Sequence, residues 1–223
     1  ASGCSLATEN FRMHRKRGAC SRPDLERPGA PGQGLIAGGI RLSSGRMELA
    51  DFIRFGCEPP PLRFLVIGGY AVAAHGHTRA TFDVDLLVRR AEREGWLVRL
   101  AAAGLKLFGE TIAFAQFTQP QGGDGLDLMF VDEPTFERMW QASEERDFGG
   151  SRARVPCLDH MLALKLHALK QTLPHRTSKD AEDVEMLVRR NGLDLSDPRY
   201  ELLFLKYGSR ELFDTFVRLL RNP

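Results

Sequence analysis

Apolar and polar positions along this chain follow two distinct periodicities. Apolar runs and period-2 alternation predict strands, whereas recurrence every three to four residues predicts helices. Strands are predicted at residues 63–67, 83–89, 105–108, 112–118, 126–131 and 153–157. Helices are predicted at 48–55, 69–76, 91–103, 134–142, 158–172, 178–191 and 197–221, with the last one broken near Gly208. The order predicts an α+β fold, in which a small mixed sheet with flanking helices precedes a helical C-terminal part.

The character of the chain changes at Met47. Residues 1–46 are rich in Gly, Pro, Ser and Arg and lack sustained periodicity, which is typical of segments that remain disordered. The chain begins without Met and Met47 resembles a natural start, so we interpret 1–46 as translated upstream sequence without assigned function. A basic RNA-binding arm and an organellar transit peptide are the alternatives. The predicted organisation is then a catalytic core at 47–157 and a helical region at 158–223.

Composition narrows the class of protein. A chain of 223 residues that is 43% hydrophobic can bury one proper core. No apolar run approaches the roughly 18 residues of a membrane-spanning helix. The four cysteines lack CxxC spacing, which argues against a zinc site or disulfide framework and favours a reducing, cytoplasmic setting. The net charge is +2, but 1–46 are strongly basic, so the remainder is mildly acidic and charge alone does not indicate a nucleic-acid partner.

Candidate chemistry is concentrated in residues 64–88. An apolar strand ends at Gly68-Gly69, and the next predicted strand carries Asp83 and Asp85. Period 2 places these two carboxylates on one face, where they repel each other unless a cation lies between them. Mg²⁺ prefers oxygen ligands and is usually shared with substrate phosphates. Backbone N–H groups at a glycine turn before a helix point at an anion, so the pattern predicts phosphoryl or nucleotidyl transfer.

Two glycines, thirteen intervening residues and Asp-x-Asp form an ordered motif. This motif resembles the nucleotidyltransferase superfamily with the DNA polymerase β-type fold. Within that superfamily, residues 68–88 look most like the AbiEii/AbiGii toxin-type nucleotidyltransferases. The later segments 125–130, 162–168 and 178–183 look like further motifs of that family, so the resemblance covers roughly residues 64–190.

The resemblance implies an enzyme that transfers NMP from an NTP to an acceptor hydroxyl or phosphate. Asp83, Asp85 and a third carboxylate would hold one or two Mg²⁺ ions, and the third would also orient or deprotonate the acceptor. We assign the third role to Asp127, which lies inside an apolar strand on the face opposite its leucine neighbours. Asp124 is interpreted as a turn residue and Asp132 as a strand end.

Polar residues just before Asp83 have two interpretations each. Arg79 and Thr81 either contact a nucleotide phosphate or are a solvated loop arginine and a strand-edge threonine. His75 and His77 lie at the end of the short predicted helix, where a histidine is more often a capping partner than a base.

The helical region holds a second group of candidates. Lys165 interrupts an apolar stripe, so it either contacts nucleotide or a downstream acid, or extends its ammonium to solvent. Asp180 is assigned to nucleotide binding, although Thr177 three residues earlier also allows a capping box. Lys179 and Asp183 are interpreted by default as an ordinary i,i+4 pair. The family resemblance implies instead that these residues, like Asp180, bind metal, nucleotide or Lys165.

No feature of the sequence identifies the acceptor. The toxin-type resemblance implies a growth-inhibiting enzyme that acts on RNA such as tRNA and is neutralised by an antitoxin protein. One alternative is a small-molecule nucleotidyltransferase of the antibiotic-modifying type, and another is a catalytically silent nucleotide-binding module.

Overall fold

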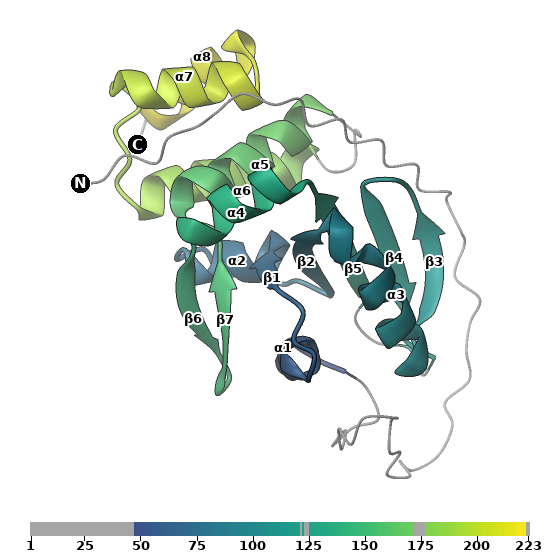
Figure 1. Ribbon diagram of the computed structural model, residues 1–223. Coiled ribbons are helices and arrows are strands. Elements are labelled where there is room, and N and C mark those ends of the chain that lie inside the picture. Colours follow the sequence, from purple (N-terminus) through teal and green to yellow (C-terminus); the bar gives the residue numbers. More distant parts are fainter. Residues whose placement is uncertain (1–46, 121, 123–124, 172–176, 222–223) are drawn as a thin grey trace, which may run out of the picture.

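The computed structural model describes residues 47–120, 122, 125–171 and 177–221. The predictions for 1–46 and for Asp124 therefore lie outside the described residues. Within the described ranges the predicted α+β fold is confirmed, as a mixed sheet with helices against both faces and a helical C-terminal part (Figure 1). No helix in these ranges is long and apolar enough to cross a membrane.

The central sheet has five strands in the order β1-β2-β5-β4-β3. Their bounds are β1 (Phe64–Ile67), β2 (Asp83–Arg89), β3 (Lys106–Glu110), β4 (Phe114–Thr118) and β5 (Gly125–Val131). β2 and β5 run parallel, and the other neighbouring pairs are antiparallel. The central strands β2 and β5 are therefore adjacent and begin at the same edge of the sheet.

Alternation along β2 and β5 sends side chains into two separate cores. Leu86 and Leu128 face the larger core, which also contains residues of α1 (Leu49–Cys57), α2 (Gly68–Ala74) and α3 (Arg93–Ala102). Leu87 and Met129 face a smaller core with residues of α4 (Glu133–Gln141). Asp83 and Asp85 lie on the same face of the sheet as Leu87, and Asp127 lies on the same face as Met129, because residues i and i+2 of a strand share a face.

Four helices form the C-terminal part: α5 (Leu158–Lys170), α6 (Thr177–Arg190), α7 (Pro198–Tyr207) and α8 (Arg210–Arg221). α5 contacts both α6 and α7, and α7 contacts α8 (Figure 1). The predicted break near Gly208 is confirmed, because Gly208 caps α7. α5 brings Leu164 onto the smaller core, so this helix joins the C-terminal part to the sheet face that carries the acids.

The hairpin of β6 (Glu144–Phe148) and β7 (Ser151–Val155) differs from the prediction. β6 was not predicted, because four of its five residues are charged and it has no apolar stripe. The predicted strand at 153–157 was shifted, since Pro156 has no N–H to continue the ladder. β7 packs on β1 and α1, which places the hairpin beside the sheet rather than in it.

Most helices differ from prediction by one or two residues at their ends, and α2 and α3 are examples. α2 ends at Ala74 rather than at residue 76, and the helix predicted from 91 begins as a short 3-10 turn, η1 (Arg90–Glu92), before α3. Both differences lie at helix ends, where the local sequence is least decisive.

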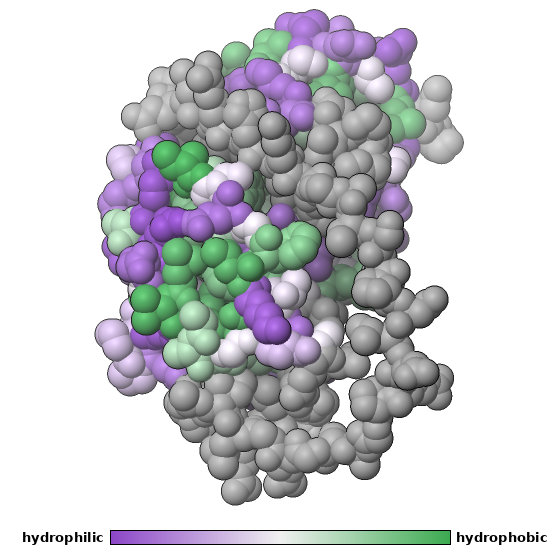
Figure 2. Space-filling model, turned by 90° about the vertical axis from the view of Figure 1, so that its right-hand side faces the viewer, coloured by the Kyte–Doolittle hydropathy of each residue, from purple (hydrophilic) through white to green (hydrophobic). Residues whose placement is uncertain are grey.

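The outer strand β3 carries exposed apolar side chains. Leu107 is 47% exposed, Phe108 is 62% exposed, and Ile112 in the following turn is 78% exposed. Figure 2 shows hydrophobic residues gathered on the face of the molecule to which β3 belongs. Lys106 and Glu110 at the two ends of the strand and a bulge at Leu107–Gly109 are features that limit edge-to-edge pairing of strands.

Candidate active site

The three predicted carboxylates come from the two parallel central strands. Asp85 of β2 lies directly opposite Asp127 of β5 in the strand register, and Asp83 lies opposite Gly125. Because residues i and i+2 share a face, all three side chains project toward the same side of the sheet. Asp127 is buried, whereas Asp83 and Asp85 are half-buried.

Gly68 and Gly69 form the turn from β1 into α2 and pack directly against this acidic face. Gly68 has φ +65°, and a Cβ there would lie 2.1 Å from Oδ2 of Asp85. A Cβ on Gly69 would lie 2.5 Å from Oγ1 of Thr81. Both contacts are shorter than any side chain tolerates, so glycine is required for the backbone to approach Asp85 and Thr81 this closely.

A pocket of about 210 Å³ lies between the acidic face, the glycine turn and the helices α5 and α6. All nine residues that the sequence nominated line it: Gly68, Gly69, Arg79, Thr81, Asp83, Asp85, Asp127, Lys165 and Asp180. Lys179 and seven mostly apolar residues complete the lining: Ile67, Phe82, Phe114, Met129, Met161, Leu164 and Ala168. The pocket therefore offers carboxylates, cations and apolar surface within one cavity.

Arg79 approaches the pocket in a fixed orientation. Its Nε and Nη2 donate to Oδ1 and Oδ2 of Asp183 at 2.6 and 2.8 Å, a two-pronged contact. The hydrogen bond that Arg79 donates to Asp183 raises the pKa of Arg79 and outweighs the opposing effect of burial. Arg79 is therefore an ordered cation at the pocket wall, and the solvated-loop interpretation does not describe it.

Lys165 lies between two acids of α6. Its Nζ is 2.9 Å from Oδ1 of Asp180 and 2.6 Å from Oδ2 of Asp183. Burial acts to lower the pKa of Lys165, but the charges of Asp180 and Asp183 outweigh it and raise that pKa. The lysine therefore stays charged beside the pocket, paired with downstream acids, and does not extend into solvent.

Asp183 corrects one interpretation made from the sequence. The default interpretation was an i,i+4 partner of Lys179, but the side chain of Asp183 is 0% exposed and contacts Arg79 and Lys165. The contact with Lys165 agrees with the alternative that the family resemblance implied. Burial acts to raise the pKa of Asp183, and the hydrogen bond from Arg79 together with the charge of Lys165 lowers it overall. Helical spacing with Val184 and Leu187 was the signal available, since it places positions 180 and 183 near the inner face of the helix.

Two further residues of the site escaped the sequence reading. Gln116 of β4 lies opposite Asp127, and its Nε2 donates to Oδ1 and Oδ2 at 3.0 and 3.1 Å. Phe82 lines the pocket although it is 72% exposed. Cross-strand register between β4 and β5 was needed to place Gln116, whereas the aromatic ring beside Asp83 was visible in the sequence.

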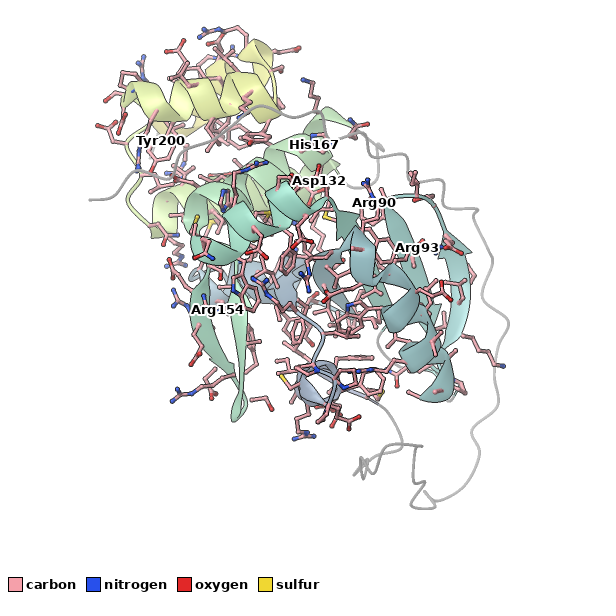
Figure 3. All side chains as sticks on the ribbon, in the orientation of Figure 1. Arg90, Arg93, Asp132, Arg154, His167 and Tyr200 are labelled. Carbon is pink, nitrogen blue, oxygen red and sulfur yellow. The ribbon has the colours of Figure 1, made fainter. Side chains whose placement is uncertain are left out.

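Other polar residues near the motif have structural contacts. The ring of His75 lies 2.8 Å from the carbonyl oxygen of Pro156, and His77 lies 3.9 Å from Glu182. Asp132 accepts from the backbone N–H of Thr135 and caps α4, where Figure 3 labels it. The interpretation of Asp132 as a strand end agrees with this position. The side chain of Thr177 lies outside the described residues, so the predicted capping box with Asp180 stays a prediction.

The donor set of the pocket suits a hard cation, but its present arrangement does not form a ligand shell. Three carboxylates on one face supply the oxygens that Mg²⁺ prefers. Among the described residues, no group of three Asp, Glu, His or Cys side chains is placed to hold a metal ion. The amide of Gln116 already contacts both oxygens of Asp127. Rotation of these carboxylates would be needed before all three reach one ion.

Comparison with solved structures identifies the fold. The crystal structure of ANT(2")-Ia in complex with adenylyl-2"-tobramycin has a TM-score of 0.54 and 18% sequence identity, and the match covers 71% of this chain and 94% of that one. The solution structure of the antibiotic-resistance factor ANT(2")-Ia has a TM-score of 0.54 at 15% identity, covering 77% and 94%. The fold is that of a nucleotidyltransferase.

The nucleotidyltransferase fold is thus shared with proteins of low sequence identity. An antigenic nucleotidyltransferase-like protein from Paracoccidioides brasiliensis also matches, with a TM-score of 0.48, 14% identity and coverage of 78% and 85%. No protein-family model and no curated protein sequence matches this chain. The narrower likeness to AbiEii/AbiGii toxin-type enzymes stays a prediction.

Proposed function

We propose that this protein is a metal-dependent nucleotidyltransferase that moves NMP from an NTP to an acceptor hydroxyl or phosphate and releases pyrophosphate. One observation carries the proposal. Asp83, Asp85 and Asp127 project from two parallel strands into a pocket that is also lined by a glycine turn packed against Asp85. Surface acids have no need of such a turn, whereas a site that brings phosphates to carboxylates does.

Asp83, Asp85 and Asp127 would hold one or two Mg²⁺ ions. Bound there, such an ion would supply neutralisation of the negative charge that the triphosphate brings to the acids. The glycine turn lines the same pocket, where its backbone N–H groups would meet the β- and γ-phosphates. Arg79 and Lys165 line the same pocket and supply positive charge for the remaining phosphate oxygens.

The reaction itself is an in-line displacement. The acceptor oxygen forms a bond to the α-phosphorus, and the bond from that phosphorus to the bridging oxygen breaks, so pyrophosphate leaves. Asp127 lies on the strand next to Asp85 and would orient the acceptor or receive its proton. Most of the catalysis would be positioning and charge neutralisation, as is usual for phosphoryl chemistry.

Two acceptor classes remain candidates within this proposal. The toxin-type resemblance favours RNA such as tRNA, together with a neutralising antitoxin protein. The ANT(2")-Ia structure holds adenylyl-2"-tobramycin, which favours a small-molecule acceptor for this chain as well. The apolar lining at Phe82, Phe114 and Met129 is compatible with a nucleobase or with an organic acceptor.

Label transfer tests the proposal. The full chain is incubated with each α-labelled NTP, Mg²⁺, total RNA and a low-molecular-weight extract, beside Asp83→Asn and Asp214→Asn variants. Asp214 lies exposed on α8, outside the pocket lining, so its variant controls for the loss of one surface charge. We expect transfer by the wild-type protein and the Asp214 variant, with a loss of about 100-fold or more for Asp83→Asn.

Each result either identifies the class of acceptor or overturns the proposed enzymatic function. Label on RNA supports the toxin-like function, and label on a small molecule supports the antibiotic-modifying class. Absence of transfer from every NTP, with nucleotide still bound, would support the catalytically silent module and overturn the proposed function. Equal transfer by wild type and Asp83→Asn would exclude this pocket as the catalytic site.

A further inference from the structure

A buried carboxylate outside the pocket lining connects two of the three cations that line it, Arg79 and Lys165. Asp183 of α6 is 0% exposed and is not part of the pocket surface. Both its oxygens are engaged, with Oδ1 bound to Arg79 and Oδ2 bound to Arg79 and Lys165. A buried charge of this kind is costly unless it is fully paired, and this one is paired with the two cations nearest the candidate phosphate site.

Arg79 is the first of the two cations. It lies in the connection between α2 and β2, which otherwise is a short irregular segment. Its Nε and Nη2 face Asp183, while Nη1 would lie 3.3 Å from a Cβ built on Gly69. The guanidinium plane is therefore fixed on one side by Asp183 and borders the glycine turn on the other.

Lys165 is the second cation and comes from α5. A lysine side chain has four rotatable bonds and carries no intrinsic direction. Asp180 and Asp183 together hold its ammonium group, and only 11% of the side chain is exposed. Asp183 is the member of this cluster that contacts both cations, so it couples the orientation of Arg79 to that of Lys165.

We propose that Asp183 is a positioning residue that holds Arg79 and Lys165 in the orientation in which they meet the phosphates of a bound nucleotide. This inference rests on the proposed function. Asp183 does not reach the pocket, so it acts through the two cations and does not touch substrate.

The charges give this role a distinctive signature. Arg79, Lys165, Asp180 and Asp183 together are electrically balanced, with two positive and two negative groups. Asp183→Asn removes one negative charge and leaves the pocket more positive, so attraction of a triphosphate is retained or strengthened. The cations lose their fixed orientation, however, and misplacement at this scale costs about 10- to 100-fold in rate.

The experiment measures kcat and the Kd for NTP separately, using the full chain, its best NTP and the acceptor fraction that receives label. Asp183→Asn is expected to lower kcat by about 10- to 100-fold while the Kd for NTP stays equal or falls. A merely structural carboxylate would instead lower the melting temperature and weaken NTP binding together with activity. A carboxylate that ligates Mg²⁺ directly would shift the Mg²⁺ concentration needed for half-maximal rate.

Loss of Asp183 alone leaves two buried cations underpaired, so Asp183→Asn could lower activity by misfolding. A double-mutant cycle separates that effect from a positioning role. Arg79→Gln and the Arg79→Gln/Asp183→Asn double variant are compared with wild type, and the double variant removes both members of one ion pair. If Asp183 acts through Arg79, Asp183→Asn lowers kcat less in the Arg79→Gln background than in wild type. An equal loss in both backgrounds overturns the inference.

The outcomes separate this inference from the function on which it rests. A wild-type protein that transfers no nucleotide overturns both. An active wild-type protein together with an Asp183→Asn variant of unchanged kcat overturns the positioning role alone. Weakened NTP binding in the folded Asp183→Asn variant also overturns it, since positioning predicts no such loss.

Discussion

Gly68 is the residue at which backbone conformation and candidate chemistry constrain each other most directly. Its φ of +65° lies in the left-handed region, which L side chains rarely adopt. Its missing side chain also leaves the space in which Asp85 lies. The close packing of this turn against Asp85 therefore requires a hydrogen atom where any other residue has a Cβ.

Substitution of Gly68 by Ala should separate these two effects when it is matched with Gly149→Ala. Gly149 has φ +66° in the β6–β7 turn, and a Cβ there meets nothing within 4 Å. Both variants should lose about 1–2 kcal/mol of unfolding free energy in urea from the left-handed conformation. Gly68→Ala should lose more, because Asp85 must move, and its transfer rate should fall by about 10- to 100-fold. Equal losses in stability and full activity in Gly68→Ala would contradict the assigned contact.

At the residue scale, the sequence nominated pocket residues that lie in one segment. It was weaker for residues whose contact partners lie far away along the chain. The Asp83 and Asp85 pair and the glycine turn are local, so period 2 and the turn were enough to nominate them. Asp183 needed the docking of α6 on Arg79, which lies 104 residues away. Helical spacing with Val184 and Leu187 marks the inner face of the helix, but no local pattern identifies the distant arginine as the partner of Asp183.

At the scale of elements, apolar patterning located the strands and helices that the core requires. β2 was predicted over the same residues as it occupies, since its buried leucines and valine are bounded by polar positions. β6 was missed because four of its five residues are charged, and its strand pairing with β7 could not be read from the sequence. Strand order could not be predicted from the sequence either. This order places Gln116 of β4 beside Asp127 of β5.

Gln116 therefore provides a test of the carboxylate face that depends on this register. Gln116→Glu places a carboxylate where an amide now donates to Asp127, so like charges meet in a buried site and stability should fall by about 1–3 kcal/mol. Mg²⁺ should restore part of this loss by lying between the acids, and should raise the urea midpoint of the variant more than that of wild type.

Gln116→Leu is the matched control for that substitution. It removes the amide donor without adding charge, so its response to Mg²⁺ should resemble that of wild type. A Gln116→Glu variant whose midpoint does not respond to Mg²⁺ would show that these carboxylates do not bind the ion.

At the scale of the whole molecule, the helical part and the sheet are joined through α5, which carries two buried histidines. His160 and His167 are 6% and 8% exposed, and Figure 3 labels His167 on this helix. Burial lowers the pKa of His160 below its usual 6.5; Asp159 opposes this shift and Arg138 reinforces it. Burial also lowers the pKa of His167, with a further contribution from Lys170. Both rings are therefore neutral in the folded protein over a range in which the unfolded chain begins to bind protons.

Stability should consequently fall as the pH drops from 7.5 to 5.5. Below pH 6.5 the histidines bind protons in the unfolded chain but stay neutral in the folded protein. Each histidine therefore lowers the free energy of unfolding by up to about 1.4 kcal/mol per pH unit until its folded pKa is reached. The lowered pKa of Asp183 acts in a separate window, below the ordinary aspartate value of 3.8, and leaves this range unaffected. Urea midpoints at the two pH values measure the change, and a His160→Gln/His167→Gln double variant should show a smaller fall than wild type. An identical fall in both proteins would place the acid sensitivity outside α5 and contradict the assignment to these two rings.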